Sequence, residues 1–164
     1  MKNSKVKNIT HSAIIAALYV VLTIAAQFLG LASGSVQVRF SEALTILPVF
    51  TSAAIPGLAI GCLISNIISG GVIWDIIFGT FATLIGAVGT YMLRKHKWEA
   101  SIPPIVSNTV IIPFVLIYAY GATEALPFLM LTVGIGEVIS AGVLGTMLLK
   151  TLDKTNIFKQ KMSQ

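Results

Sequence analysis

Residues 93–98 read Leu-Arg-Lys-His-Lys-Trp, a short basic stretch in the middle of a chain with few other charges. Long apolar stretches separate it from two further basic clusters, one in each tail. Those clusters are Lys2, Lys5 and Lys7 at the start and Lys150, Lys154, Lys159 and Lys161 at the end. Because positively charged loops stay on the cytoplasmic side of a membrane, all three clusters are expected on one face. The chain therefore crosses the membrane an even number of times between each pair.

The composition indicates an integral membrane protein. Apolar residues make up 55% of the 164 residues and charged residues 10%. With a mean hydropathy of +0.90, the chain is too apolar for a soluble domain of this length. The net charge of +5 is explained by attraction of the basic segments to anionic membrane lipid, which excludes nucleic acid as a partner. The single Cys62 excludes an intrachain disulfide and a thiolate metal site, and no motif of a metal or nucleotide enzyme is present.

The apolar segments predict an all-α membrane protein of six transmembrane helices, in a single domain with both termini in the cytoplasm. Two short segments, divided at Ile55-Pro56, are counted as two helices, since one crossing there would separate the Arg94 cluster from the N-terminal tail. The expected helices are 12–31, 41–54, 56–69, 74–93, 102–120 and 125–149, between cytoplasmic tails 1–11 and 150–164.

Small residues mark helix faces that are expected to pack closely. Asp75 begins one such stripe, which continues as Gly79, Ala82, Gly86 and Gly89. Because small side chains let helices approach in lipid, this stripe should face the bundle. Ala13 and Ala17 form a shallow groove at the cytoplasmic end of the first helix. That groove packs either against a partner helix or against the protein's own bundle.

The last expected helix carries an acid near its centre. Glu137 lies about twelve residues, or ~20 Å, from the start of the helix, close to the bilayer midplane. A carboxylate there costs on the order of 3 kcal/mol, so a functional site is the default expectation. The alternatives are a structural polar pair with Asn108 or Asn66 and a permanently protonated acid that donates to a carbonyl.

Further polar residues are expected to cluster at the outer surface. They are Gln37, Arg39, Glu42, Trp74 and Asp75. Arg39 is spaced either to form an i, i+3 ion pair with Glu42 or to contact a ligand. Trp74 is either an interfacial anchor or a stacking platform for a planar ligand. Asn66 and Asn108 lie in apolar segments, where an amide either bonds between helices or binds the edge of a heterocycle.

The stretch VQVRFSEALTILPVFTSAAIPGLAIGCLISNI (36–67), together with Ala13-x-x-x-Ala17, resembles the substrate-binding S component of an energy-coupling-factor (ECF) vitamin transporter. Within that class the chain is most similar to the QueT family of queuosine-precursor transporters. The resemblance covers essentially the whole chain and implies a multi-pass protein of a bacterial cell membrane. It also implies a scaffold transmembrane subunit, which would contact Ala13 and Ala17, and two ATPase subunits that use ATP. The S component itself would be no enzyme, carry no cofactor and capture its ligand at the extracellular side.

A deazaguanine-type ligand would present a ring N–H and an exocyclic amine side by side. One carboxylate accepts both, and Glu137 is the expected acceptor. If the ligand carries an aminomethyl cation, Asp75 or Glu42 would neutralise it, and Trp74 would stack on the ring. The remaining hydrogen bonds would come from Asn66 and Asn108.

Two other functions fit the same residues. One is an S component for another vitamin, such as a flavin or a thiamine-like molecule. The other is a free-standing proton-coupled carrier of a small molecule that uses Glu137 as its proton relay.

Overall fold

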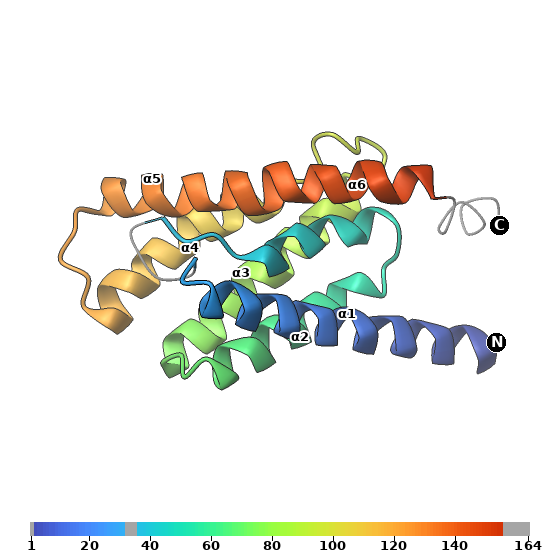
Figure 1. The fold of residues 1–164 in the computed structure, drawn as a ribbon, viewed down its shortest axis with the longest axis horizontal. Helices are drawn as coiled ribbons and strands as arrows, with labels where there is room; N and C mark the ends of the chain where they lie inside the picture. The colour runs from blue at the N-terminus through green and yellow to red at the C-terminus, as the bar shows by residue number, and fades with distance from the viewer. Residues whose placement is uncertain (1, 32–35, 156–164) are drawn as a thin grey trace.

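The computed structural model of the protein describes residues 2–31 and 36–155, and these ranges contain helices and no strand. The α-helices are α1 (Lys2–Phe28), α2 (Ala54–Ile68), α3 (Ile73–Met92), α4 (Ile102–Tyr120), α5 (Leu126–Glu137) and α6 (Gly145–Lys154). A 3₁₀ helix, η1 (Phe40–Val49), lies between α1 and α2. A π-helical segment, η2 (Val138–Leu144), joins α5 to α6 in one rod (Figure 1).

Four helical stretches are long and apolar enough to cross a membrane: Lys5–Phe28, Ile73–Met92, Ile102–Tyr120 and Leu126–Lys154. This confirms the all-α membrane class. The other two apolar helices, η1 and α2, have 10 and 15 residues, fewer than the ~20 that an untilted spanning helix needs.

Several helix boundaries differ from those expected. α1 already begins at Lys2, because residues 2–11 contain no Gly or Pro that would end the helix. The break before α2 falls at residues 50–53, where the Ala53 N–H bonds to the Thr51 hydroxyl. Pro56 then lies inside the first turn of α2, where its missing N–H removes no helical bond. The last helix runs on to Lys154, and residues 156–164 of the expected tail lie outside the described ranges.

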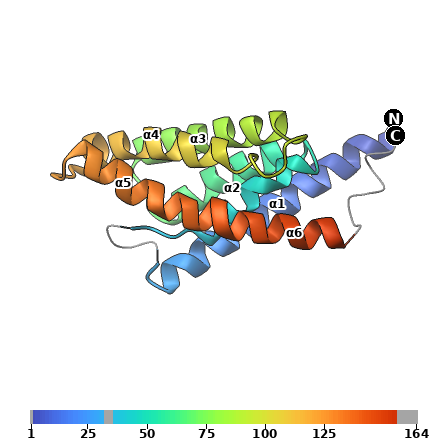
Figure 2. The ribbon, with the colours of Figure 1, turned by 90° about the horizontal axis from the view of Figure 1, so that it is seen from above.

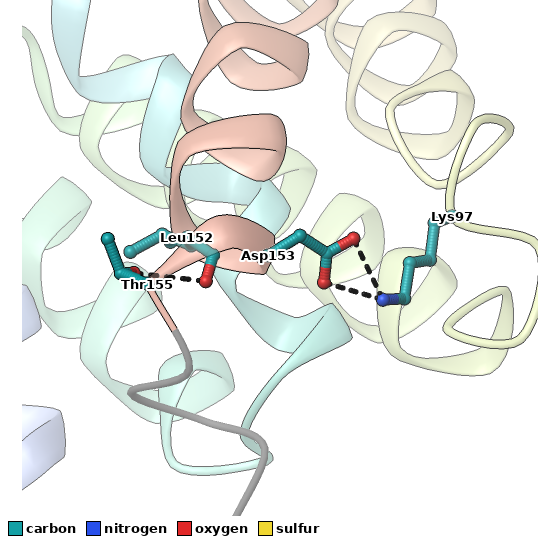
Figure 3. A network of polar contacts seen from close by, with 4 residues as sticks. All are labelled: Lys97, Leu152, Asp153 and Thr155. Atoms are coloured by element: carbon teal, nitrogen blue, oxygen red, sulfur yellow. Dashed lines mark hydrogen bonds and ion pairs between the residues drawn. The ribbon is translucent and has the colours of Figure 1, made fainter.

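One end of the bundle holds the basic segments. The Ser12 hydroxyl of α1 donates to the carbonyl of Ala53 at 2.7 Å, so the first part of α1 lies beside the start of α2. Lys97, in the loop between α3 and α4, forms an ion pair of 2.7 Å with Asp153 near the end of α6 (Figure 3). The N-terminal end of α1, the 93–101 loop and the end of α6 therefore lie at the same end of the molecule (Figures 1 and 2).

At the opposite end of the molecule, hydrogen bonds connect the other helix ends. The Gln27 amide near the end of α1 donates to the Ser69 hydroxyl after α2 at 2.6 Å. The Tyr120 hydroxyl at the end of α4 donates to the Asp75 carboxylate at the start of α3 at 2.9 Å. The helices α1, α2, α3 and α4 thus each run from one end of the molecule to the other. This agrees with the spacing of the basic clusters along the chain.

Glycines let the helices pack at close range. A side chain at Gly57 or Gly61 of α2 would collide with α1, because a Cβ there would lie 2.7 Å from Ser12 or Tyr19. On α3, a Cβ at Gly86 would lie 2.7 Å from Pro104 of α4. The stripe that begins at Asp75 therefore faces the bundle, as its spacing predicts.

Candidate functional site

Glu42 lies on the buried side of η1 with 2% of its surface exposed, deeper than the outer position expected from the sequence. The Tyr19 hydroxyl of α1 donates a hydrogen bond to its Oε1 atom. The Asn108 amide of α4 donates a long bond of 3.5 Å to its Oε2 atom. Within the described ranges, Glu42 is held by these neutral donors rather than by an ion pair with Arg39.

Glu137 ends α5 and is also buried, with 8% of its surface exposed. Its carboxylate lies within electrostatic range of Glu42 and Arg39 and also interacts with the Asn108 amide. Its Oε2 atom is buried and has no hydrogen-bond partner among the described residues. An unpaired carboxylate oxygen is costly in an apolar interior, so this atom is available to a donor from outside the chain.

Residues 36–39, which we call the outer strap, cross α5 and η2 beside Glu137. A Cβ at Gly136 would lie 2.2 Å from the Gln37 carbonyl oxygen, so only glycine lets the strap come this close. The backbone N–H of Arg39 donates to the Ser140 hydroxyl at 3.0 Å. These two contacts lie one residue before Glu137 and three residues after it, so the strap crosses the helix next to the acid.

Arg39 brings a positive charge to the strap. Its side chain is half-buried, and its Nη2 atom donates to Gln37 Oε1 at 3.3 Å. Removal from water opposes the charged form, but the nearby acidic groups of Tyr19, Asp75 and Glu42 outweigh this, and the pKa of Arg39 is raised from its ordinary value. The guanidinium therefore stays ionised among these acids.

Asp75 and Asn66 border the same glycine on α3. A Cβ at Gly79 would lie 3.0 Å from Asn66 Nδ2 and 3.6 Å from Asp75 Oδ1. The Asn66 amide approaches the Cys62 sulfur at 3.6 Å. Asp75 accepts the hydrogen bond from Tyr120. Both side chains therefore lie near the outer end of the α2 and α3 contact.

The structure does not place the Trp74 side chain with Glu42 and Glu137. Its side chain is 55% exposed and stacks with Phe78, with 6.1 Å between ring centroids. It lines an outward-facing apolar groove of about 540 Å³ between α3 and α4, together with Phe81, Phe114 and Tyr118. This position suits an interfacial anchor rather than a platform beside Glu137.

Glu42, Glu137 and Asn108 thus come together from η1, α5 and α4, with Arg39 of the outer strap nearby. Sequence reasoning missed Tyr19, whose hydroxyl holds Glu42. The available signal was a tyrosine inside an apolar helix, because a buried phenol needs a hydrogen-bond partner. Tyr120, Gly136 and Ser140 were missed as well, since their roles depend on segments distant in the sequence.

The two residues expected to contact a partner lie at the basic end of α1. Ala13 and Ala17 are exposed, whereas the neighbouring Ala16 is buried against Gly61 of α2. A groove of about 520 Å³ runs between the starts of α1 and α2 and is lined by Ala13 and Pro56 among others. The outward face of α1 therefore carries small side chains that the described bundle leaves uncovered.

Comparison with known proteins gives one family and one relative. The QueT transporter family matches residues 9–154. Over 99 residues the chain is 41% identical to a protein of Lactococcus lactis subsp. cremoris (strain MG1363) named "Queuosine precursor transporter QueT". The aligned region covers 59% of this chain and 57% of the relative, a little over half of that protein's length. No solved structure matches the chain.

Proposed function

Because the chain belongs to the QueT transporter family, we propose that it captures a queuosine precursor of the 7-deazaguanine type at the outer face of a bacterial cell membrane. The observation that carries this proposal is the family match over residues 9–154, which includes every acid of the candidate site. The name of the Lactococcus relative supports the same substrate class.

In this proposal Glu137 recognises the guanine-like edge of the ligand. Its unpaired Oε2 atom is an acceptor, and such an edge offers two N–H donors side by side. A carboxylate that accepts both forms short, charge-assisted hydrogen bonds in a site without water. Asn108 interacts with the same carboxylate, and its side-chain amide would contact the ring as well. The outer strap would move away to admit the ligand.

We further propose six membrane-embedded segments, with η1 and α2 as the two short ones and both termini in the cytoplasm. The common end of the basic segments supports this arrangement, because positive loops remain in the cytoplasm. The acids then lie toward the extracellular side, where the ligand is captured.

The protein would act as the S component of an ECF transporter. The sequence contains no motif for nucleotide hydrolysis, so the energy of ATP would come from two ATPase subunits through a scaffold transmembrane subunit. The exposed Ala13 and Ala17 offer that scaffold a surface for close helix approach.

Calorimetry on the purified chain tests the substrate. Saturable binding of a 7-deazaguanine precursor, with no binding of riboflavin or thiamine, is the expected result. Binding of a vitamin in its place would assign the chain to another S component.

Vesicle experiments test the mechanism. The chain alone should not accumulate ligand when a pH gradient is applied, whereas vesicles with the scaffold and ATPases should accumulate it when ATP is added. Uptake by the chain alone would instead establish a proton-coupled carrier.

A further inference from the structure

Two neighbouring contacts hold the loop between α3 and α4 against the end of α6. Lys97 forms its ion pair with Asp153 (Figure 3), and the Lys150 ammonium lies 5.2 Å from the centre of the Trp98 ring. A cation over the face of a tryptophan ring is attracted by the negative charge of that face. These contacts therefore keep Lys150 and Trp98 together at the basic end of the molecule.

The charge of Lys150 is not neutralised within the described part of the chain. The ion pair found in residues 2–31 and 36–155 is that of Lys97 with Asp153, and the Lys150 side chain is exposed. Its surroundings are basic as well, because the loop 93–101 contains three cations and one acid, and α6 contains two cations and one acid. This local excess of positive charge favours an anionic partner.

An apolar groove lies between α4 and the segment formed by α5 and η2. It has a volume of about 490 Å³ and is lined by Ile105, Val110 and Ile139 among others. Ile105 and Val110 lie about 5 and 12 Å along α4 from its first residue, which is at the basic end. Both depths fall within the nearer half of a ~30 Å hydrocarbon core. The groove therefore has the position and the lining that suit a lipid acyl chain of that leaflet.

A row of exposed side chains connects the groove to Lys150. Its members follow one another along η2 and α6 at spacings of four, four and three residues: Ile139, Val143, Met147 and Lys150. Residues three or four apart lie on the same face of a helix. This face thus changes from apolar at the groove to cationic at the basic end, as a surface that binds a phospholipid would.

We propose that an anionic phospholipid binds along the groove and this row, with its phosphate at Lys150 beside Trp98 and one acyl chain in the groove. An ammonium group donates hydrogen bonds to phosphate oxygens, and a tryptophan ring is suited to the headgroup level of a membrane. A soluble anion would leave the apolar groove unfilled, and a zwitterionic phospholipid would bring a cation of its own toward Lys150. In the proposed orientation the lipid belongs to the cytoplasmic leaflet.

Quenching of Trp98 fluorescence by brominated lipids tests the site. Trp74→Phe leaves Trp98 as the only tryptophan, and the full chain is placed in vesicles of mixed phosphatidylcholine and phosphatidylglycerol. One lipid or the other carries acyl chains brominated near the headgroup. Phosphatidylglycerol should bind beside Trp98 about fivefold more tightly, because its anionic headgroup is attracted by Lys150. Equal binding of the two lipids would overturn the proposal without any change to the site itself.

Two variants of equal charge separate a specific site from general attraction to an anionic membrane. Lys150→Gln should reduce the preference for phosphatidylglycerol to within about twofold, because the ammonium that attracts the phosphate is gone. Lys7→Gln removes the same charge from α1 at the same end of the molecule and should leave the preference unchanged. Equal losses in the two variants would overturn a specific site at Lys150.

Two further outcomes would assign the surface to another partner. Glycerol 1-phosphate, which has the phosphate without acyl chains, should not relieve the quenching at millimolar concentration. Relief of quenching would show a site for a soluble phosphate and overturn the proposed lipid. Unchanged lipid preference in Lys150→Gln, together with loss of co-purification with the scaffold and ATPases, would show a protein partner instead. None of these measurements depends on ligand binding, so their failure would leave the proposed function intact.

Discussion

The Glu137 carboxylate is costly to bury, and one of its oxygens has no hydrogen-bond partner among the described residues. The side chain is 8% exposed, and its Oε2 atom has no partner among the described residues. A buried unpaired polar atom costs about 1 to 3 kcal/mol, which a ligand donor would recover on binding. Such an atom is therefore better suited to a binding role than to a purely structural one.

Glu137→Gln should weaken ligand binding by at least about 1.5 kcal/mol, or roughly tenfold, because one acceptor oxygen becomes a donor that opposes a ligand N–H. Isothermal titration calorimetry measures this effect, and the melting temperature should stay near that of the wild type. Glu124→Gln, at an exposed position, is the matched control. Unchanged affinity in the Glu137 variant would make this residue structural and move the ligand edge to Asp75 or Glu42.

The contact of the outer strap with α5 allows a second test at the scale of one residue. Gly136→Ala would place a methyl group 2.2 Å from the Gln37 carbonyl oxygen, and a backbone atom cannot turn aside as a flexible side chain can. Displacement of the strap should lower stability by about 1 to 3 kcal/mol, which thermal unfolding in micelles detects.

Gly134→Ala on the same helix is the control, because its new Cβ would lie at an ordinary 3.4 Å from Thr109. This variant should be close to neutral or slightly stabilising, since alanine favours a helix over glycine. Equal losses of stability in the two variants would show that the contact between the outer strap and Gly136 does not contribute specifically to stability.

At the scale of one element, α1 has two faces with different tasks. Its inner face packs on the glycines of α2, where a Cβ at Gly61 would lie 3.0 Å from the Ala16 carbonyl oxygen. Its outer face presents Ala13 and Ala17, which are exposed although they are small. Substitutions at neighbouring positions of α1 can therefore test packing within the bundle and contact with a partner separately.

Replacing both Ala13 and Ala17 with Trp should abolish ATP-driven uptake and co-purification with a scaffold subunit, because the bulk prevents close helix approach. Ligand binding by the isolated chain should remain near wild type, since the candidate site lies toward the other end of the helices. Ala16→Trp is the control and should instead lower stability and ligand binding, because Ala16 is 7% exposed. Full uptake by the double variant would remove the argument for a partner at this surface. Joint loss of binding and thermal stability in it would show that the two alanines pack internally.

At the scale of the whole molecule, the common end of the three basic segments predicts a topology. In a Cys62→Ala background, a cysteine at exposed Lys95 should resist an impermeant thiol reagent in intact cells, whereas one at exposed Glu124 should react. Both should react after the cells are permeabilised. Labelling of the Lys95 position in intact cells would contradict the proposed orientation.

Much of the fold could be predicted from local patterns. The long apolar stretches and the basic clusters predict the membrane class, and the fifth expected helix coincides with α4 (Ile102–Tyr120). The sequence predicts the break after η1 at Ile55-Pro56, a few residues later than in the structure, because proline is tolerated inside the first turn of a helix as well as at its start. The sequence also predicts that Glu137 is removed from water, and the side chain is buried.

The sequence by itself determined the membrane class, the resemblance to a transporter family and the burial of an acid in the last helix, because these depend on composition, residue spacing and recognisable local stretches. Only the tertiary structure decided that Glu42 lies beside Tyr19 and Asn108, which are 23 and 66 positions away. It also decided that Trp74 faces outward and that the strap crosses α5 at Gly136. The physical reason is that these contacts follow from how several helices pack together, and periodicity along one helix does not specify which neighbour each face will meet.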